Sequence, residues 1–435
     1  MKKYLLLIIY VFSITAKAQT LYFPPTSGTD WDTISPASLG WCEDKIDTLY
    51  DYLEARNSKA FILLKDGKIV MEKYFGTFTM DSVWYWASAG KTLTAFTVGI
   101  AQQEGFLDIN DPTSQYLGAG WTVCPPAKED LITIKHQLSM TSGLDDGVPD
   151  NHCFADTCLQ YIADAGTRWA YHNAPYTLLD SVIYYATGQS LNSYVMQNIG
   201  VPIGMTGMFV YSNNNNVFYS KPRSMARFGL LILNHGNWNG NQILTDTEYF
   251  NQMVNTSQNI NQSYGYLWWL NGKSSYRLPN LQLQFNGYLN PNAPADMYAA
   301  LGKNGQFINV VPSMNLTFIR MGNAPTSSAV PFTMNDTIWQ KLIEIMCNKT
   351  AVTQVSVERN AVLQVYPNPA QHTFTIELPN KSFSLEVFDI TGRKIYAQDN
   401  ISNRTEIDCS NFSRGIYKVQ VTDSKNSYNQ KLIIQ

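Results

Sequence analysis

Ser88-Ala89-Gly90-Lys91 is the stretch that decides the fold and the chemistry expected of this chain. Two shorter motifs follow it in order, Tyr171-His172-Asn173 and Lys303-Asn304-Gly305. A Ser-x-x-Lys pattern alone is common by chance, and its serine is then most often an ordinary helix N-cap. Three ordered motifs of the types Ser-x-x-Lys, Tyr-x-Asn and Lys-x-Gly are far more specific. They predict that three distant parts of the chain meet around Ser88.

Apolar residues recur at helical spacing from Ser88 to Glu104, which predicts a helix that begins at Ser88. Lys91 then lies one turn later on the same face. The free N–H groups at a helix start favour negative charge that develops there. The local structure therefore suits a serine nucleophile with a lysine beside it.

An unactivated serine hydroxyl is a poor nucleophile, so a base must take its proton as it attacks. Lys91 can do this when its amine is neutral. Tyr171 is a second candidate, because two flanking cations, Lys91 and Lys303, would favour its phenolate. The residues leave open which of the two accepts the proton, and we expect them to act as a unit.

The segments around the Ser88 helix predict an α+β fold. Residues 60–76 form a hairpin with an Asp66-Gly67 turn, and residues 297–323 form three successive antiparallel strands that close the sheet. Residues 131–144 are expected to be a helix within a mostly helical region that runs to about residue 238. A last helix covers residues 333–347. This order predicts an antiparallel sheet flanked by helices plus a helical lobe, with the site between them.

The composition and the hydrophobic pattern of the sequence change after residue 348. Residues 349–361 are polar and have no periodicity, which is typical of a linker. Residues 362–435 contain short alternating strands separated by turn signals such as Thr391-Gly392-Arg393. A small C-terminal β-sandwich is expected there.

Residues 19–348 resemble the serine β-lactamase-related hydrolase family, which includes class C β-lactamases, D-Ala-D-Ala carboxypeptidases, esterases and nylon-oligomer hydrolases. The resemblance implies a β-lactamase/transpeptidase-like fold and hydrolysis of an ester or amide through an acyl-enzyme on Ser88. The substrate would be a small or peptide-like molecule, and no cofactor is implied. Further stretches that carry the resemblance are Ile132–Leu138, Thr141–Leu144, Ala226–Leu230 and Gly265–Trp269.

The resemblance also implies roles for the other motif residues. Asn173 would hydrogen-bond the Lys91 ammonium and a substrate carbonyl, and Lys303, on a strand facing the cleft, would meet a substrate carboxylate. Gly305 would let substrate approach that strand without a side chain in the way. The oxyanion hole would use the backbone N–H groups of Ser88 and Gln306.

Asn304 departs from the family pattern, because β-lactamases prefer a hydroxyl residue at this place. This departure argues against a penicillin-cleaving enzyme and leaves the hydrolase interpretation intact. Ester, amide and β-lactam substrates remain open. The alternative from another class is a non-catalytic surface protein of the same fold that binds cell-wall peptides or penicillin. Intact Ser88, Lys91 and Tyr171 favour the enzyme.

Both ends of the chain indicate export. Residues 1–18 resemble a signal peptide, with Lys2-Lys3, an apolar run and Ala16-Lys17-Ala18 before the expected cleavage. No later segment is long and apolar enough to span a bilayer. The tail resembles the sorting domain of type IX secretion substrates, which implies a secretion-machinery partner and a secreted or cell-surface protein that passes through the periplasm. The tail motifs are Tyr366-Pro367-Asn368-Pro369, Phe388–Arg393, Gly415-Ile416-Tyr417 and Lys431–Ile434.

The composition of the chain argues against several other classes of function. The 31 Lys and Arg against 34 Asp and Glu give a formal net charge of −3, which argues against nucleic acid as a partner. The five His show no ligand cluster, so no metal is expected. Six cysteines in an exported chain allow 15 full pairings, so the disulfide pairing stays open. Cys153 and Cys158 are close enough in sequence to staple one loop, and Cys42 and Cys347 lie in the first and last helical segments of the main domain. Cys124 has no obvious partner, and Cys409 lies in the separate tail.

Overall fold

The computed structural model describes residues 21–212, 214–325, 330–347, 363–423 and 427–435. The expected signal peptide (1–18) and linker (349–361) therefore lie outside the described residues. Within the described ranges, no helix is both long and apolar enough to cross a bilayer.

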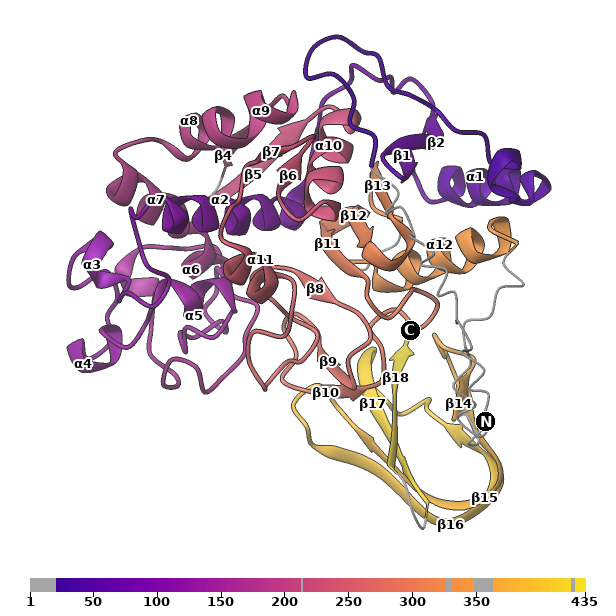
Figure 1. Cartoon of the computed structure of the whole chain (residues 1–435). Coiled ribbons are helices and arrows are strands. Elements are labelled where there is room, and N and C mark those ends of the chain that lie inside the picture. The colour runs from indigo at the N-terminus through magenta and orange to yellow at the C-terminus, as the bar shows by residue number, and fades with distance from the viewer. Residues whose placement is uncertain (1–20, 213, 326–329, 348–362, 424–426) are drawn as a thin grey trace, which may run out of the picture.

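A six-stranded antiparallel sheet forms the centre of the main domain (Figure 1). Its first two strands are joined at Asp66 and Gly67, whose φ angles of 52° and 81° are those of a tight two-residue hairpin turn. The hairpin and the three closing strands agree with the sequence prediction. In spatial order the strands are β2 (Lys68–Tyr74), β1 (Ser58–Lys65), β13 (Leu316–Gly322), β12 (Gln306–Val311), β11 (Tyr298–Gly302) and β8 (Trp269–Leu270).

Helices cover both faces of this sheet. On one face, α10 (Pro222–Leu233) approaches so closely that a Cβ on Gly229 would lie 2.8 Å from Thr317 Oγ1. On the other, α12 (Phe332–Ile345) packs Trp339 against Phe318 at 5.4 Å between ring centroids, with α1 (Ile46–Ala55) beside it. Consecutive residues of β13 point to opposite faces, so the two helices lie on opposite sides.

The helical lobe is built on α2 (Lys91–Gln103), whose residues are buried from Lys91 to Ala101. It contacts α7 (Leu179–Thr187) and α11 (Thr247–Met253). The helix expected over residues 131–144 is shorter, because the left-handed backbone of Met140 and Gly143 ends it. The short helices here are α3 (Ser114–Leu117), α4 (Pro126–Glu129), α5 (Ile134–Leu138), α6 (Asn173–Thr177), α8 (Leu191–Val195) and α9 (Val201–Ile203).

A small sheet that the sequence did not predict supports the segment before Ser88. Its order is β3 (Trp84–Tyr85), β5 (Asn215–Ser220) and β4 (Gly207–Ser212). Two further hairpins lie outside the main sheet, β6–β7 (Asn237–Trp238 and Asn241–Gln242) and β9–β10 (Ser275–Arg277 and Gln284–Asn286).

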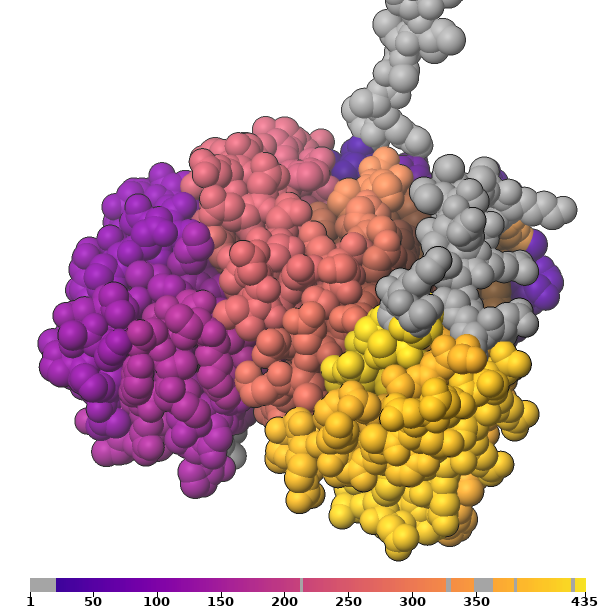
Figure 2. Space-filling view, turned by 90° about the horizontal axis from the view of Figure 1, so that it is seen from below, coloured from indigo at the N-terminus to yellow at the C-terminus, as the bar shows by residue number. Residues whose placement is uncertain are grey.

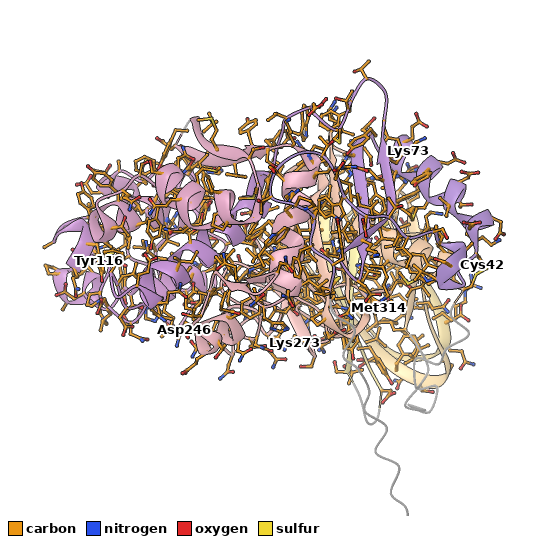
Figure 3. The ribbon with its side chains drawn as sticks, turned by 45° about the horizontal axis from the view of Figure 1, so that its top comes forward. Cys42, Lys73, Tyr116, Asp246, Lys273 and Met314 are labelled. Carbon is orange, nitrogen blue, oxygen red and sulfur yellow. A yellow bond between two sulfur atoms is a disulfide. The ribbon has the colours of Figure 1, made fainter. Side chains whose placement is uncertain are left out.

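The pairing that the sequence left open is Cys42–Cys347 and Cys153–Cys158. Cys124 and Cys409 are free and buried. Figure 3 places Cys42 at the sheet end of the molecule and Tyr116 at the opposite, helical end. Cys42–Cys347 thus closes the sheet end of the domain, whereas Cys153–Cys158 lies in a loop of the helical lobe.

The C-terminal residues form a second domain with its own hydrophobic core (Figure 2). Its antiparallel sheet agrees with the expected small β-sandwich, although several predicted short strands merge into two long ones. It meets the main domain where β18 contacts β10. The strands are β14 (Gln364–Tyr366), β15 (Thr373–Phe388), β16 (Lys394–Asp408), β17 (Gly415–Thr422) and β18 (Ser427–Ile434).

Candidate active site

Ser88 lies in a one-turn 3-10 helix, Ala87–Gly90, that leads directly into α2. The chain enters this turn sharply, because Ala87 has a φ of 47°. Trp86 anchors the entry: its backbone N–H donates to Phe218 O (2.8 Å) and its indole Nε1 to Ser220 Oγ (2.7 Å). Ser88 therefore stays partly exposed on a fixed turn, whose first N–H groups have no partner within the helix.

Lys91 is buried beside the Ser88 hydroxyl, as the sequence predicts. Its Nζ lies 3.3 Å from Ser88 Oγ, and only 3% of the residue is exposed. Burial lowers the pKa of Lys91 to about 7. Its Nζ lies 4.1 Å from the Tyr176 ring centroid and 5.5 Å from that of Tyr171. A large fraction of Lys91 is thus a free amine at neutral pH.

Tyr171 also hydrogen-bonds Ser88, but the expected phenolate is wrong. Burial raises the pKa of Tyr171 to about 12. Its ring stacks on Trp269 at 6.0 Å and 15° and meets the edge of Tyr264 at 6.3 Å. Lys91 faces the ring of Tyr171, and Lys303 is exposed. Neither cation therefore offsets the rise in the Tyr171 pKa that burial causes. Tyr171 is a protonated phenol at neutral pH.

Asn173 begins α6, close to Tyr171 in the chain. Its backbone N and side-chain Nδ2 both donate to Asn151 Oδ1, at 2.9 and 2.7 Å. The expected hydrogen bond to the Lys91 ammonium is not among the contacts of the described residues. Asn151, which the sequence motifs do not include, is the residue that holds Asn173.

The third motif forms a turn and not part of a strand. Lys303–Gly305 is a 3-10 turn between β11 and β12, and Lys303 is exposed in it. Asn304 has a φ of 63°, a conformation that asparagine tolerates well, and its Nδ2 donates to Tyr85 Oη (2.7 Å). The expected placement of Lys303 on a strand is therefore wrong, and backbone conformation explains the departure at Asn304.

The absence of a side chain at Gly305 is needed for the backbone of the turn and does not open space for a substrate. It is buried with a φ of 80°, and a Cβ there would lie 2.6 Å from Arg320 Nη1. The fully buried Arg320 guanidinium donates to the carbonyls of Asn304 (2.6 Å) and Gly305 (2.9 Å). The expected substrate-binding role of Gly305 is not supported, because the missing side chain would point into the protein.

Gly305→Ala should destabilise the main domain by about 3 kcal/mol, since it adds left-handed strain and a clash with Arg320. Gly188→Ala is the matched control: Gly188 has a φ of 73°, and a Cβ there would meet nothing within 4 Å, so the change adds only the backbone cost. Denaturant unfolding measures both. Equal losses of unfolding free energy in the two variants would show that the Arg320 contact is unimportant.

Gln306 is not placed to supply the oxyanion hole. It lies on β12, an inner strand paired with β11 on one edge and β13 on the other. It is fully buried, and its side-chain amide donates to Gly322 O (2.6 Å) and accepts from Gly322 N (3.0 Å). Its backbone N–H therefore cannot face the Ser88 hydroxyl.

The free edge of β11 supplies the residue that the sequence missed. Ala299 pairs with Trp269 of β8, but β8 does not continue: the Leu267 N–H turns away and donates to Leu138 O (3.0 Å). Alternate residues of a strand present their N–H and C=O groups to the same edge. Leu301 therefore presents both groups on the edge where β8 has ended.

This edge passes directly beside the nucleophile turn. A Cβ on Gly302, the residue after Leu301, would lie 2.6 Å from Trp86 O and 3.0 Å from Ala89 N. Within the described part of the chain, the Leu301 N–H thus has no strand partner and lies next to the Ser88 turn. No side-chain motif marks a backbone donor of this kind; only the strand register reveals it.

Two histidines of this region have lowered pKa values. Burial lowers the pKa of His152, and the positive charges of Lys91 and Lys303 lower it further against the opposing charge of Asp150. His172 is buried away from solvent, and burial lowers its pKa to about 4. No group of metal-ligating side chains occurs among the described residues.

Comparison with known proteins agrees with this architecture. Residues 46–342 match the family described as Beta-lactamase, and residues 364–435 match the Secretion system C-terminal sorting domain. An uncharacterized protein of Alkalihalophilus pseudofirmus is 25% identical over 313 residues, which cover 63% of this chain and 86% of that protein. Penicillin-binding protein 4* of Bacillus subtilis is 25% identical over 193 residues, covering 38% of this chain and 41% of the relative. The chain thus spans less than half the length of this second relative.

Solved structures share the fold at low identity. A candidate 6-aminohexanoate-dimer hydrolase from Bacillus anthracis matches with a TM-score of 0.57 and 18% identity, over 74% of this chain and 89% of that one. An octameric penicillin-binding protein homologue from Pyrococcus abyssi matches with a TM-score of 0.53 and 15% identity, over 89% of this chain and 99% of that one.

Proposed function

The chain belongs to the beta-lactamase family, and from this premise we propose that it is an exported serine hydrolase that cleaves an ester or amide bond through an acyl-enzyme on Ser88. The observation that carries the proposal is the contact between the buried Lys91 amine and the Ser88 hydroxyl. A lysine with a pKa of about 7 is half deprotonated at neutral pH, which matches the requirement for a general base.

The proposed acylation begins when neutral Lys91 takes the Ser88 proton as Oγ attacks the substrate carbonyl carbon. The Ser88 and Leu301 N–H groups stabilise the oxyanion, and each such donor is worth about 3 kcal/mol. When the carbon–leaving group bond breaks, the Tyr171 hydroxyl donates its proton to the leaving oxygen or nitrogen. The Lys91 ammonium then passes its proton to the Tyr171 phenolate, which leaves Lys91 neutral and Tyr171 protonated. Lys91 next takes a proton from the water that attacks the acyl-enzyme, and it gives this proton to Ser88 Oγ as the acyl bond breaks.

The substrate is proposed to be a small or peptide-like ester or amide. The free β11 edge at Leu301 offers one N–H and one C=O, which suit an extended peptide-like substrate. Lys303 is exposed near His152 and can meet a substrate carboxylate. No side chain of the third motif offers a hydroxyl group for a penicillin carboxylate, which favours the ester and amide classes.

The rival function is a surface protein that binds cell-wall peptides or penicillin without turnover. Burying an amine costs stability, because desolvation disfavours its charged form. A binding protein has no need for Lys91 in its uncharged state beside a serine. The site therefore supports catalysis better than binding alone.

A substrate panel tests the proposal. Short-chain p-nitrophenyl esters, D-Ala-D-Ala peptides and nitrocefin are compared on the wild type and on Ser88→Ala. Turnover of an ester or peptide by the wild type alone supports the hydrolase. Tight binding of a peptide or of penicillin without turnover would support the rival.

Deleting residues 362–435 should leave the kcat of ester hydrolysis within about twofold, because the tail has its own hydrophobic core and is remote from Ser88 in the chain. The sorting domain at residues 364–435 indicates secretion by the type IX machinery, so the truncated protein should stay in the periplasm. Activity assays and cell fractionation check both parts. A folded truncation that has lost hydrolysis would make the tail part of the site.

A further inference from the structure

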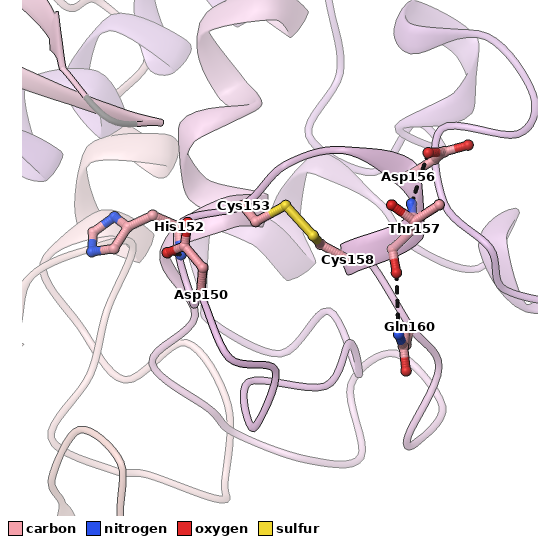
Figure 4. Close-up of a disulfide and its surroundings, with 7 residues drawn as sticks. All are labelled: Asp150, His152, Cys153, Asp156, Thr157, Cys158 and Gln160. Carbon is pink, nitrogen blue, oxygen red and sulfur yellow. Dashed lines mark hydrogen bonds between the residues drawn. A yellow bond between two sulfur atoms is a disulfide. The ribbon is translucent and has the colours of Figure 1, made fainter.

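Residues 145–160 form a cross-linked loop that contacts Asn173 through Asn151, and we name it the disulfide loop. Figure 4 shows its disulfide and the residues around it. Its base is closed where the Asp145 N–H donates to Gln160 O (2.8 Å). Within it, the Cys153–Cys158 disulfide joins two points five residues apart. The loop is thus a braced unit whose middle contacts the segment that follows Tyr171.

Asn151, two residues before the disulfide, is bound to the Tyr-x-Asn segment at three points. Its Oδ1 accepts from Asn173 N (2.9 Å) and Asn173 Nδ2 (2.7 Å), and its carbonyl accepts from Ala174 N (3.0 Å). Its own Nδ2 donates to Asp146 O (3.2 Å). Both ends of the Asn151 amide are therefore satisfied within this unit.

These bonds determine which way the Asn173 amide is turned. A backbone N–H can only donate, so the Asn151 atom that it meets must be the oxygen. The Asn173 side-chain atom on that same oxygen must then be Nδ2, which leaves Oδ1 as the free end. The bonds to Asn151 thus leave the acceptor Oδ1, and not the donor Nδ2, at the free end of the Asn173 amide.

Asn173 projects to the same side of the chain as Tyr171. His172 between them is extended, with φ −107° and ψ 118°. In extended backbone, residues i and i+2 project to one side and residue i+1 to the other. This agrees with the burial of His172 and with the hydrogen bond between Tyr171 and Ser88. Asn173 therefore projects from the side of this segment on which Tyr171 meets Ser88.

We infer that Asn151 is a positioning residue that fixes the orientation of Asn173, and that the Cys153–Cys158 disulfide holds Asn151 in place. This inference rests on the proposed function. The oriented Oδ1 accepts a hydrogen bond from the Lys91 ammonium or from a substrate N–H during turnover. The disulfide limits the conformations of the loop, so its loss lowers the fraction of molecules in which Asn151 reaches Asn173.

Asn151→Ala in the full-length protein should lower kcat on a p-nitrophenyl ester about 30-fold, because Asn173 loses both bonds that orient it. Asn151→Asp should recover part of that loss, since a carboxylate accepts both bonds from Asn173 although it cannot donate to Asp146 O. It should also move the acidic limb of the pH–rate profile upward, because a nearby negative charge favours the Lys91 ammonium. If Asn151 had only a structural role, the pH–rate profile of Asn151→Asp would not shift. The kcat values of Asn151→Ala and Asn151→Asp would then also be alike.

The paired variant Cys153→Ser/Cys158→Ser leaves Asn151 unchanged and should lower kcat about fivefold. Its matched control is Cys42→Ser/Cys347→Ser, which removes the other disulfide and should lower Tm while kcat stays unchanged. If Asn151→Ala does not fold, these two pairs still decide the question. Equal kcat in the two disulfide variants would contradict the inference.

Wild-type kcat in folded Asn151→Ala, or no recovery in Asn151→Asp, would also overturn the inference. Labelling with a fluorophosphonate separates this failure from that of the proposed function. If the wild type is labelled at Ser88 and turns over esters, only the role of Asn151 fails. If the wild type is neither labelled nor active, the proposed function fails and this inference fails with it.

Discussion

Ser88→Ala should lower kcat/KM for p-nitrophenyl esters by roughly 10⁴-fold, the largest loss expected of any single change in this protein. The variant removes the atom that would form the acyl-enzyme, and nothing else in the turn can replace it. The residual rate would come from the remaining oxyanion donors and substrate binding. Steady-state kinetics on highly purified protein measure the loss.

Ser82→Ala is the control for this change. Ser82 lies six residues earlier, and its Oγ accepts a hydrogen bond from the Thr79 N–H (3.0 Å) in a surface turn. Its loss should leave kcat/KM unchanged. A Ser88→Ala variant that keeps more than a tenth of wild-type activity would remove Ser88 from the chemistry.

Lys91→Met should lower kcat about 10³-fold and raise Tm by about 3 °C. The activity falls because the base is gone. The stability rises because burial disfavours the Lys91 ammonium, and a methionine of similar length has no charge to bury. Together these opposite changes show that activity is not lost through unfolding.

The same variant has a defined pH signature. The folded-state pKa of about 7 lies below the ordinary value of 10.5, so the unfolded chain holds more protons between these values. Wild-type stability should therefore rise with pH across this window, and Lys91→Met should lack that rise. Wild-type kcat/KM should fall tenfold per pH unit below about 7, as Lys91 becomes protonated. If the residual kcat/KM of Lys91→Met still falls with the same acidic limb, the group that titrates near pH 7 is a residue other than Lys91.

Short-range features of the site were predictable from sequence, because they depend on helical spacing. Ser88 and Lys91 are three residues apart at the start of a helix, and the structure brings them into contact. The Asp66-Gly67 hairpin and the Cys153–Cys158 loop are equally local, and the structure contains both.

The wrong expectations concern features set by distant residues. The pKa of Tyr171 is raised because Trp269 and Tyr264, more than 90 residues away in the chain, bury its ring. The motif around Lys303 matches a pattern, but its backbone follows the hairpin between β11 and β12. Pattern matching alone does not distinguish a strand from the turn that ends it.

The donor expected from Gln306 failed for a related reason. Whether a backbone N–H is free depends on which strands lie on either side of it, and β12 proved to be an inner strand. The donor at Leu301 is free only because β8 ends two residues too early to cover it. Strand order and length are properties of the whole sheet, so the motifs could not show them.

The mass of the protein after reaction with a labelled fluorophosphonate, followed by peptide mapping, tests the serine–lysine mechanism most directly. We expect one label per chain, on Ser88, with a labelling rate that falls tenfold per pH unit below about 7. A label on any other residue, or no label on folded wild-type protein at pH 8, would contradict it.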